Sequence, residues 1–158
     1  EAAWDHVQNV NAKGTFLCAQ AVARHMIERG GGGKIVNISS TAGRLGMPRF
    51  AAYCASKFAV IGFTQSLAHE LAEHKINVNA VCPGTTLTER TGYIAAALNE
   101  QDAPTRDATQ TMVSSSRRSP LGRVAEPEDV ARTVAFLASA ASDYTTGVAL
   151  LVAGGIQM

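Results

Sequence analysis

Apolar residues recur at helical spacing through residues 2–28, which predicts one long helix at the start of the chain. Four consecutive glycines, 30–33, end that helix, and the apolar run 34–39 predicts a short buried strand after them. A second long helix is predicted from about Ala51 to Glu73. Its positions are apolar nearly all round, which indicates burial on every side. Residues 76–82 then predict another strand, closed by a Pro-Gly pair.

The second half of the chain has a different composition and hydrophobic pattern. Residues 85–118 are rich in threonine, serine and alanine with weak helical periodicity, which predicts a helix-containing excursion. Pro127, followed by two acidic residues, predicts the start of a helix that runs to about Ser139. Residues 148–152 predict a last apolar strand. Strands that are apolar throughout and separated by helices indicate an α/β fold with a parallel sheet covered on both faces.

The predicted elements also bear on domain organisation. About three parallel strands that open on an orphan helix make a poor independent domain. We therefore expect residues 1–158 to be the C-terminal part of one larger α/β domain. No repeat, low-complexity tract or linker divides the chain.

Composition and charge narrow the classes of partner. Fourteen basic and thirteen acidic side chains give a formal net charge of +1. This charge is too small to predict binding to nucleic acid or to an anionic membrane. No apolar run is long enough to cross a bilayer. The cysteines and histidines have no metal-binding spacing, so no metal is expected. We interpret the three cysteines as buried, reduced thiols of a cytoplasmic protein whose partner is a small-molecule substrate.

Tyr53 and Lys57 are the first candidates for chemistry. Side chains four residues apart share one face of a helix, so the phenol and the ammonium should be neighbours. A free phenol gives up its proton only near pH ~10. A neighbouring ammonium favours the phenolate and would make the tyrosine a usable acid and base. The plainer interpretation is a buried phenol beside a lysine whose stem lies along the core.

Other polar positions surround that pair. Ser40 ends the first predicted strand, and the following loop can fold its hydroxyl toward Tyr53, at a strand end of the kind that binds ligands in parallel sheets. Ser39 is the alternative hydroxyl at this place. Asn11 interrupts the apolar face of the first helix, either as a site residue or as a brace for the backbone. The Pro-Gly pair directly follows another strand.

Taken together, these stretches resemble the signature set of the short-chain dehydrogenase/reductase family, in its order and at its spacings. They are Asn11 with Gly14, Val36-Asn37-Ile38-Ser39-Ser40, Tyr53 to Lys57, Pro83-Gly84 and the terminal Gly154-Gly155. The resemblance covers essentially all 158 residues. It implies a Rossmann-like doubly wound parallel sheet, of which this chain would hold the C-terminal, catalytic portion. The dinucleotide-binding N-terminal half would lie upstream of Glu1, and Ala153 stands where the family often has an acid.

The resemblance also implies an activity, the transfer of a hydride between NAD or NADP and a secondary alcohol or ketone. Tyr53 would exchange a proton with the substrate oxygen, and Lys57 would favour its phenolate and hydrogen-bond the nicotinamide ribose. Ser40 would hold the substrate oxygen, and Asn11 would position a water that links Lys57 to solvent. The cofactor-binding residues implied by the family are Tyr53, Lys57, Pro83, Gly84, Thr86 and Thr88.

The same resemblance predicts a substrate lid over 85–118, whose threonines favour a polyol, a sugar or another hydroxylated substrate. It implies a homotetramer or dimer built partly on the two long helices. A catalytically silent dinucleotide-binding or scaffold relative is one alternative, and the complete set of four candidate catalytic residues argues against it. A sugar-nucleotide epimerase or dehydratase is another, and the short stretch after Gly155 disfavours it.

Overall fold

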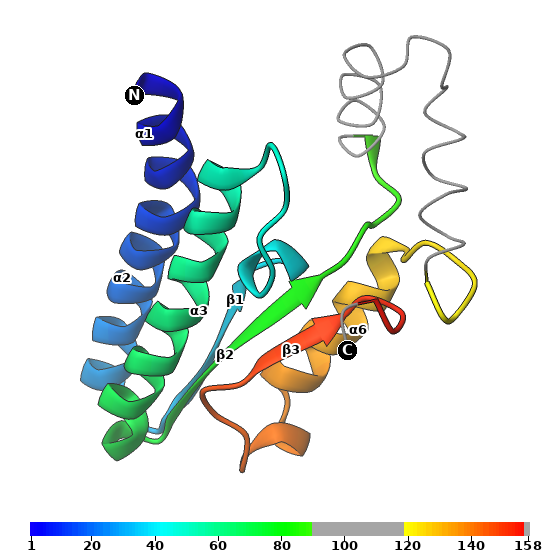
Figure 1. The fold of residues 1–158 in the computed structure, drawn as a ribbon. Helices are drawn as coiled ribbons and strands as arrows, with labels where there is room; N and C mark the ends of the chain where they lie inside the picture. Colours follow the sequence, from blue (N-terminus) through cyan, green and yellow to red (C-terminus); the bar gives the residue numbers. More distant parts are fainter. Residues whose placement is uncertain (90–118, 157–158) are drawn as a thin grey trace, which may run out of the picture.

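The computed structural model describes residues 1–89 and 119–156 (Figure 1). The elements are α1 (Ala2–Gln8), the π-helical turn η1 (Asn9–Lys13), α2 (Gly14–Arg29), β1 (Gly33–Ile38), the 3-10 turn η2 (Thr41–Gly43), α3 (Ala51–Leu71), the 3-10 turn η3 (Ala72–His74), β2 (Ile76–Pro83), α6 (Pro127–Ala138), the 3-10 turn η4 (Ala140–Ser142) and β3 (Ala149–Val152). Each helix and strand predicted from the sequence within these ranges is present, with ends that agree to about two residues. The predicted excursion over 85–118 lies outside the described residues from position 90 onward.

The three strands form one parallel sheet in the order β1-β2-β3. The register pairs Ile38 with Val81 and Pro83 with Val152, so the carboxyl ends of the strands lie along the same edge. Helices α1, α2 and α3 lie on one side of the sheet and α6 on the other (Figure 1). The predicted α/β fold with a parallel sheet between two helical layers is therefore confirmed. Within the described ranges, no helix is long and apolar enough to cross a membrane.

The main core lies between the sheet and the layer of α2 and α3. Small residues of α2 allow this helix to pack closely on the larger apolar side chains of α3 and the strands. The buried cluster consists of Ala19, Ala23, Ile35, Leu67, Ala68, Leu71, Ile76 and Val78. On the opposite face, Leu137 anchors α6 and is only 1% exposed.

Helix α3 is not buried on every side, as its all-round apolar pattern had predicted. Its inner positions are buried, but Phe58 is 47% exposed and Gln65 lies on the exposed side. A helix that rests on a sheet and is flanked by one other helix still has an outward face. The sequence pattern was therefore wrong about burial in this chain and right about the helix itself.

Candidate active site

The carboxyl ends of β1 and β2 and the first turns of α3 meet at one edge of the sheet. Ser40 follows β1, Gly84 follows β2, and Tyr53 and Lys57 lie in the first two turns of α3. The turn η2 packs on α3 and brings the loop after β1 over these turns. The structure thus brings a hydroxyl, a phenol and an ammonium to the edge where parallel sheets bind ligands.

Tyr53 and Lys57 are neighbours on α3. The Lys57 ammonium nitrogen lies 5.8 Å from the centroid of the Tyr53 ring. The same nitrogen donates a hydrogen bond of 3.0 Å to the backbone carbonyl of Ile38, the last residue of β1. Phe50 packs edge-on against the tyrosine, with ring centroids 6.4 Å apart. The ammonium therefore lies between the phenol of α3 and the end of the strand.

The two serines after β1 have different environments. Ser40 has an extended backbone, and its hydroxyl oxygen accepts a hydrogen bond of 3.1 Å from the N–H of Ala42, which caps η2. Ser39 is buried, and its hydroxyl donates a hydrogen bond of 2.8 Å to the backbone carbonyl of Lys57. Since Ser39 faces the helix, the geometry favours Ser40 as the hydroxyl that a bound molecule could reach.

Asn11 lies in a π-helical turn, η1, which interrupts the long helix predicted over 2–28. Its side-chain amide donates a hydrogen bond of 3.0 Å to the hydroxyl of Ser56, which in turn donates to the backbone carbonyl of Tyr53 at 2.7 Å. The backbone carbonyl of Asn11 accepts a hydrogen bond of 2.7 Å from the Thr15 hydroxyl. Asn11 therefore braces the turn of α3 that carries Tyr53, and π-helical turns are frequent at functional sites.

Two braces of this turn were missed by the sequence analysis. Ser56 lies inside the Tyr53–Lys57 stretch and is fully buried. Gln8 donates a hydrogen bond of 2.9 Å from its side-chain amide to the backbone carbonyl of Ala52. Gln8 lies three residues before Asn11 on the same helical segment, and this spacing is the signal that could have identified it.

Pro83 and Gly84 lie at the end of β2 and pair with the end of β3. The N–H of Gly84 donates a hydrogen bond of 2.9 Å to the carbonyl of Val152. A Cβ added at Gly84 would lie 3.1 Å from the Cβ of Ala153 and 3.2 Å from its Cα. This close approach gives Gly84 a packing reason to be glycine, whatever binds above it.

The threonines after Gly84 run toward the segment that precedes α6. Thr86 donates its hydroxyl to the carbonyl of Gly84 at 3.2 Å and pairs with Ala125 in an isolated parallel bridge. Thr88 is exposed. The expected substrate lid of 85–118 has only its first five residues, 85–89, inside the described ranges.

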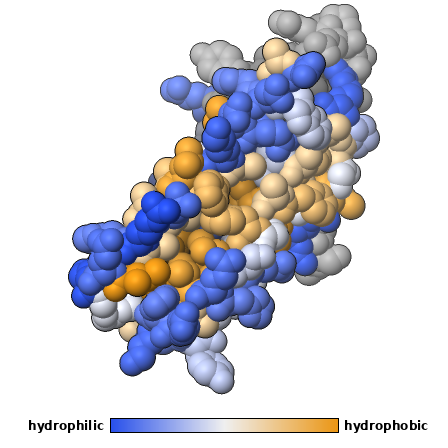
Figure 2. Space-filling view, turned by 90° about the vertical axis from the view of Figure 1, so that its left-hand side faces the viewer, coloured by the Kyte–Doolittle hydropathy of each residue, from blue (hydrophilic) through white to orange (hydrophobic). Residues whose placement is uncertain are grey.

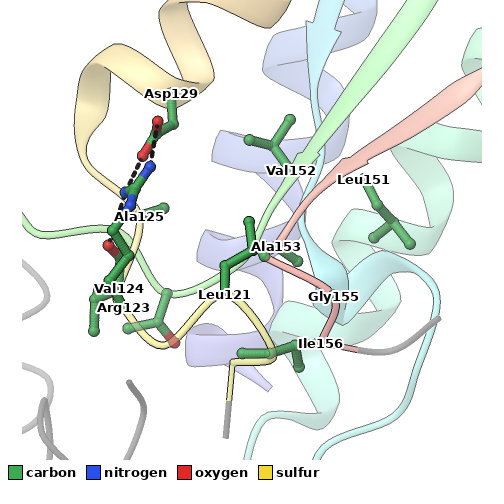
Figure 3. Close-up of a pocket in the computed structure, with 12 residues that line it drawn as sticks. Leu121, Arg123, Val124, Ala125, Asp129, Leu151, Val152, Ala153, Gly155 and Ile156 are labelled. Carbon is green, nitrogen blue, oxygen red and sulfur yellow. Dashed lines mark hydrogen bonds and ion pairs between the residues drawn. The ribbon is translucent and has the colours of Figure 1, made fainter. Parts of the chain in front are cut away.

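A cavity of about 440 Å³ lies between the end of β3 and the start of α6 (Figure 3). Its walls are mainly apolar, and its described lining contains none of Ser40, Tyr53 or Lys57. The lining residues are Thr85, Leu121, Arg123, Val124, Ala125, Asp129, Leu151, Val152, Ala153, Gly154, Gly155 and Ile156. The cavity thus lies next to the candidate site, with Thr85 in its wall, and no local pattern in the sequence predicts it.

One wall of this cavity carries an ion pair. Arg123 donates two hydrogen bonds, of 2.6 and 2.9 Å, to the two carboxylate oxygens of Asp129. The N–H of Glu126 donates to the same carboxylate at 2.9 Å as part of a capping box at the start of α6. The Arg123 hydrogen bonds, and then the Glu126 N–H, hold the pKa of Asp129 well below its usual range.

Replacing Asp129 with asparagine is expected to lower the melting temperature of the protein at neutral pH. Because the pKa of Asp129 is lowered in the fold, its stabilising effect is present above the ordinary aspartate range. The effect decreases as the pH falls below that range, near pH ~4, toward the lower pKa of the folded state. The melting temperatures of the two proteins, measured by calorimetry across this pH range, should converge in acid. A difference that stays constant with pH would contradict this account.

The cysteines and histidines show no metal-binding arrangement in the described part of the chain. Cys54 and Cys82 are buried as expected, but Cys18 is exposed, which corrects its predicted burial. Burial raises the pKa of the Cys82 thiol, and a hydrogen bond with the Ser39 side chain opposes this effect in part.

Comparison with known proteins adds to this geometry. Residues 1–157 match the protein family described as enoyl-(acyl carrier protein) reductase. The chain is 42% identical over 158 residues to the (3R)-3-hydroxyacyl-CoA dehydrogenase of Rattus norvegicus. That alignment covers 100% of this chain and 56% of the relative.

Two solved structures show the same similarity. Sorbitol-6-phosphate 2-dehydrogenase from Erwinia amylovora superposes with a TM-score of 0.93 at 31% identity, over 99% of this chain and 61% of that one. Gluconate 5-dehydrogenase from Burkholderia cenocepacia, solved in complex with NADP and tartrate, gives a TM-score of 0.84 at 36% identity. That superposition covers 99% of this chain and 56% of the other. The chain therefore spans little more than half the length of the relatives it matches.

Proposed function

Because the chain belongs to the short-chain dehydrogenase/reductase family, and has the C-terminal portion of its Rossmann-like sheet, we propose that the protein containing it is a dehydrogenase or reductase. The reaction is the transfer of a hydride between NAD or NADP and a secondary alcohol or ketone. The observation that carries the proposal is the Lys57 ammonium over the Tyr53 ring, hydrogen-bonded to the last residue of β1, at the edge of the sheet where Ser40 begins the following loop.

The chemistry of the donor set fits a nicotinamide nucleotide. A ribose carries hydroxyls that an ammonium and a phenol can bind, and a carboxamide needs both donors and acceptors. Lys57 and Tyr53 would hold the ribose, and Thr86 and Thr88 the carboxamide. Pro83 and Gly84 would let the backbone lie close to the ring. When bound, the nicotinamide would supply the hydride chemistry, which belongs to the cofactor and not to the protein.

Tyr53 is the proposed general acid and base. In the direction of reduction, its phenol gives a proton to the carbonyl oxygen, and in oxidation its phenolate takes the proton from the alcohol. Lys57 supports this exchange because its positive charge favours the phenolate. The ring is held by Phe50, and the backbone of its turn is held by Ser56. The protein therefore keeps the phenol in a fixed place before any substrate binds.

Ser40 and Asn11 have supporting roles in the proposal. Ser40 binds the substrate oxygen and stabilises the charge that develops on it during the transfer. Asn11 positions a water through which Lys57 exchanges protons with solvent. The second role is supported by the hydrogen bond of the Asn11 amide to Ser56, the residue before Lys57.

The substrate is proposed to be a hydroxylated molecule such as a polyol or a sugar. The names of the relatives include a sorbitol-6-phosphate dehydrogenase, a gluconate dehydrogenase and a hydroxyacyl-CoA dehydrogenase, all of which name alcohols or their derivatives. Thr85 and Thr86 place hydroxyls beside Gly84, which suits such a substrate. Thr91 lies outside the described residues, with the rest of the proposed lid from position 90 onward.

A homo-oligomer, a tetramer or a dimer, is the proposed assembly. Figure 2 shows a band of hydrophobic surface between hydrophilic margins, on the side of the molecule where α1 and α2 lie. Large apolar side chains exposed on the helices include Val10, Phe16, Leu17 and Phe58. Sedimentation of the complete protein at micromolar concentration should give a mass of two or four chains, and a monomer would contradict this expectation.

The cytoplasm is the proposed compartment, since all three cysteines are unpaired.

The experiment that tests the proposed function follows the absorbance of the reduced nicotinamide. The complete protein is incubated with NAD and with NADP against polyols, sugars, sugar acids, hydroxyacyl thioesters and simple secondary alcohols. Turnover with one cofactor would support the proposal and identify the cofactor and the substrate class together. Dinucleotide binding without turnover across the whole panel would contradict it and favour a silent binding protein.

A further inference from the structure

We propose that Ser39 is a positioning residue for Lys57, because its buried hydroxyl fixes the backbone of α3 at Lys57 and thereby the place of the ammonium beside Tyr53. The inference rests on the proposed function, in which Lys57 is the cation that supports the tyrosine. It assigns Ser39 a task distinct from that of its neighbour Ser40.

Two consecutive residues hold Lys57. Ser39 binds its backbone, and Ile38, the last residue of β1, binds its side chain. Its backbone carbonyl accepts the Ser39 hydroxyl at 2.8 Å, and its ammonium donates to the carbonyl of Ile38 at 3.0 Å. A lysine side chain has many rotamers when only its Cα is fixed. Fixing the backbone relative to β1 sets the distance that the side chain must span to Ile38, and therefore its position over the Tyr53 ring.

Gly43 closes over this hydrogen bond. A Cβ added at Gly43 would lie 2.5 Å from the Ser39 hydroxyl oxygen and 2.7 Å from the Lys57 carbonyl oxygen. No side chain fits there, so the loop after β1 lies directly against both partners. Ser39 is 3% exposed and Ala42 1% exposed, so no water competes for the hydroxyl from the loop side.

The groups that face this hydrogen bond are also defined. From β2, the Cys82 thiol is hydrogen-bonded with the Ser39 side chain, and burial raises its pKa, which favours the neutral thiol. Arg44 and Lys57 are the cations whose charge acts on that thiol.

A second hydrogen bond in the same interface provides a matched control. Asn37 and Ser39 are alternate residues of the β1 segment and therefore face the same side. The Asn37 amide donates a hydrogen bond of 3.0 Å to the hydroxyl of Thr64, which lies two helical turns beyond Lys57. Both partners are buried, so losing this bond should weaken the packing of α3 on β1 without reaching Tyr53.

The test compares Ser39→Ala with Thr64→Val in the complete protein. Ser39→Ala should lower kcat about tenfold or more, because a displaced ammonium is poorly placed for the reaction. In the direction of alcohol oxidation, where the Tyr53 phenolate is the proposed base, Ser39→Ala should also move the acid limb of the pH profile of kcat to higher pH, since the phenolate is less supported. Thr64→Val should lower the melting temperature at least as much and leave kcat and its pH profile within about twofold of the parent.

Equal effects of the two variants on kcat and on the pH profile would overturn the proposal, because Ser39 would then act only through packing. Gly43→Ala tests the same hydrogen bond without removing the hydroxyl, and it too should lower kcat and move the acid limb to higher pH. Tyr53→Phe is measured in parallel. If it abolishes turnover while Ser39→Ala behaves like the parent protein, the positioning role fails and the proposed function stands. If Tyr53→Phe remains fully active, the proposed function fails as well.

Discussion

A Tyr53→Phe variant of the complete protein is expected to keep its fold and to lose about 10²- to 10⁴-fold in kcat. The substitution removes one oxygen and keeps the ring that packs edge-on against Phe50, so α3 should remain in place. The variant lacks the hydroxyl that is proposed to exchange a proton with the substrate oxygen. The loss should therefore appear in kcat, measured from the absorbance of the reduced nicotinamide under saturating cofactor and substrate.

Tyr144→Phe provides the control for this result. Tyr144 is fully exposed, between η4 and β3, so the same chemical change there should leave kcat unaffected. The dissociation constant of the dinucleotide, measured by fluorescence titration, should change much less than kcat in Tyr53→Phe. Undiminished turnover by this variant would refute Tyr53 as the acid and base, and with it the mechanism proposed for the protein.

Replacing Lys57 with methionine is expected to lower kcat by about 10²-fold and to weaken dinucleotide binding at the same time. Methionine keeps most of the length and apolar character of the lysine stem, so packing on α3 changes little. It removes the charge beside the Tyr53 ring and the hydrogen bond to the carbonyl of Ile38. Because the ammonium has two proposed roles, kcat and the KM of the cofactor should both change.

Lys75→Met is the matched control for this substitution. Lys75 is an exposed residue between η3 and the amino end of β2, whereas the candidate site lies at the carboxyl ends of the strands. It should leave both kinetic constants near those of the parent protein. A Lys57→Met variant with normal kcat and a raised cofactor KM alone would restrict Lys57 to binding and would contradict its role in supporting the phenolate.

The elements that the sequence predicted well are those with strong local signals. Gly30 ends α2 with a positive φ of 71°, which glycine adopts without strain. Pro127 opens α6, followed by the acidic residue that completes the capping box. The apolar runs before Ser39 and before Pro83 became paired parallel strands. Each of these features depends on a few adjacent residues, so a single sequence is enough to identify it.

The parts that the sequence could not predict depend on contacts between distant segments. The four-residue spacing of Tyr53 and Lys57 predicts that they are neighbours, because a helix imposes it. The facing of Ser39 toward the Lys57 carbonyl depends on how α3 lies over β1, which the buried pair Asn37 and Thr64 helps to set. The exposure of Cys18 and the cavity beside Thr85 likewise follow from tertiary packing, of which the local pattern carries no trace.

The π-helical turn η1 changes how substitutions on the first helical segment should be designed. A π turn holds one more residue than an α turn, so the positions before Asn9 and after Lys13 are out of phase with each other. A helical wheel drawn without a break through residues 2–29 misplaces the residues of α2 relative to those of α1 by about 100°, the rotation of one residue in an α-helix. Two separate wheels, one for α1 and one for α2, assign the inward and outward faces correctly. An engineer who solubilises or cross-links this segment should therefore treat it as two short helices in different registers.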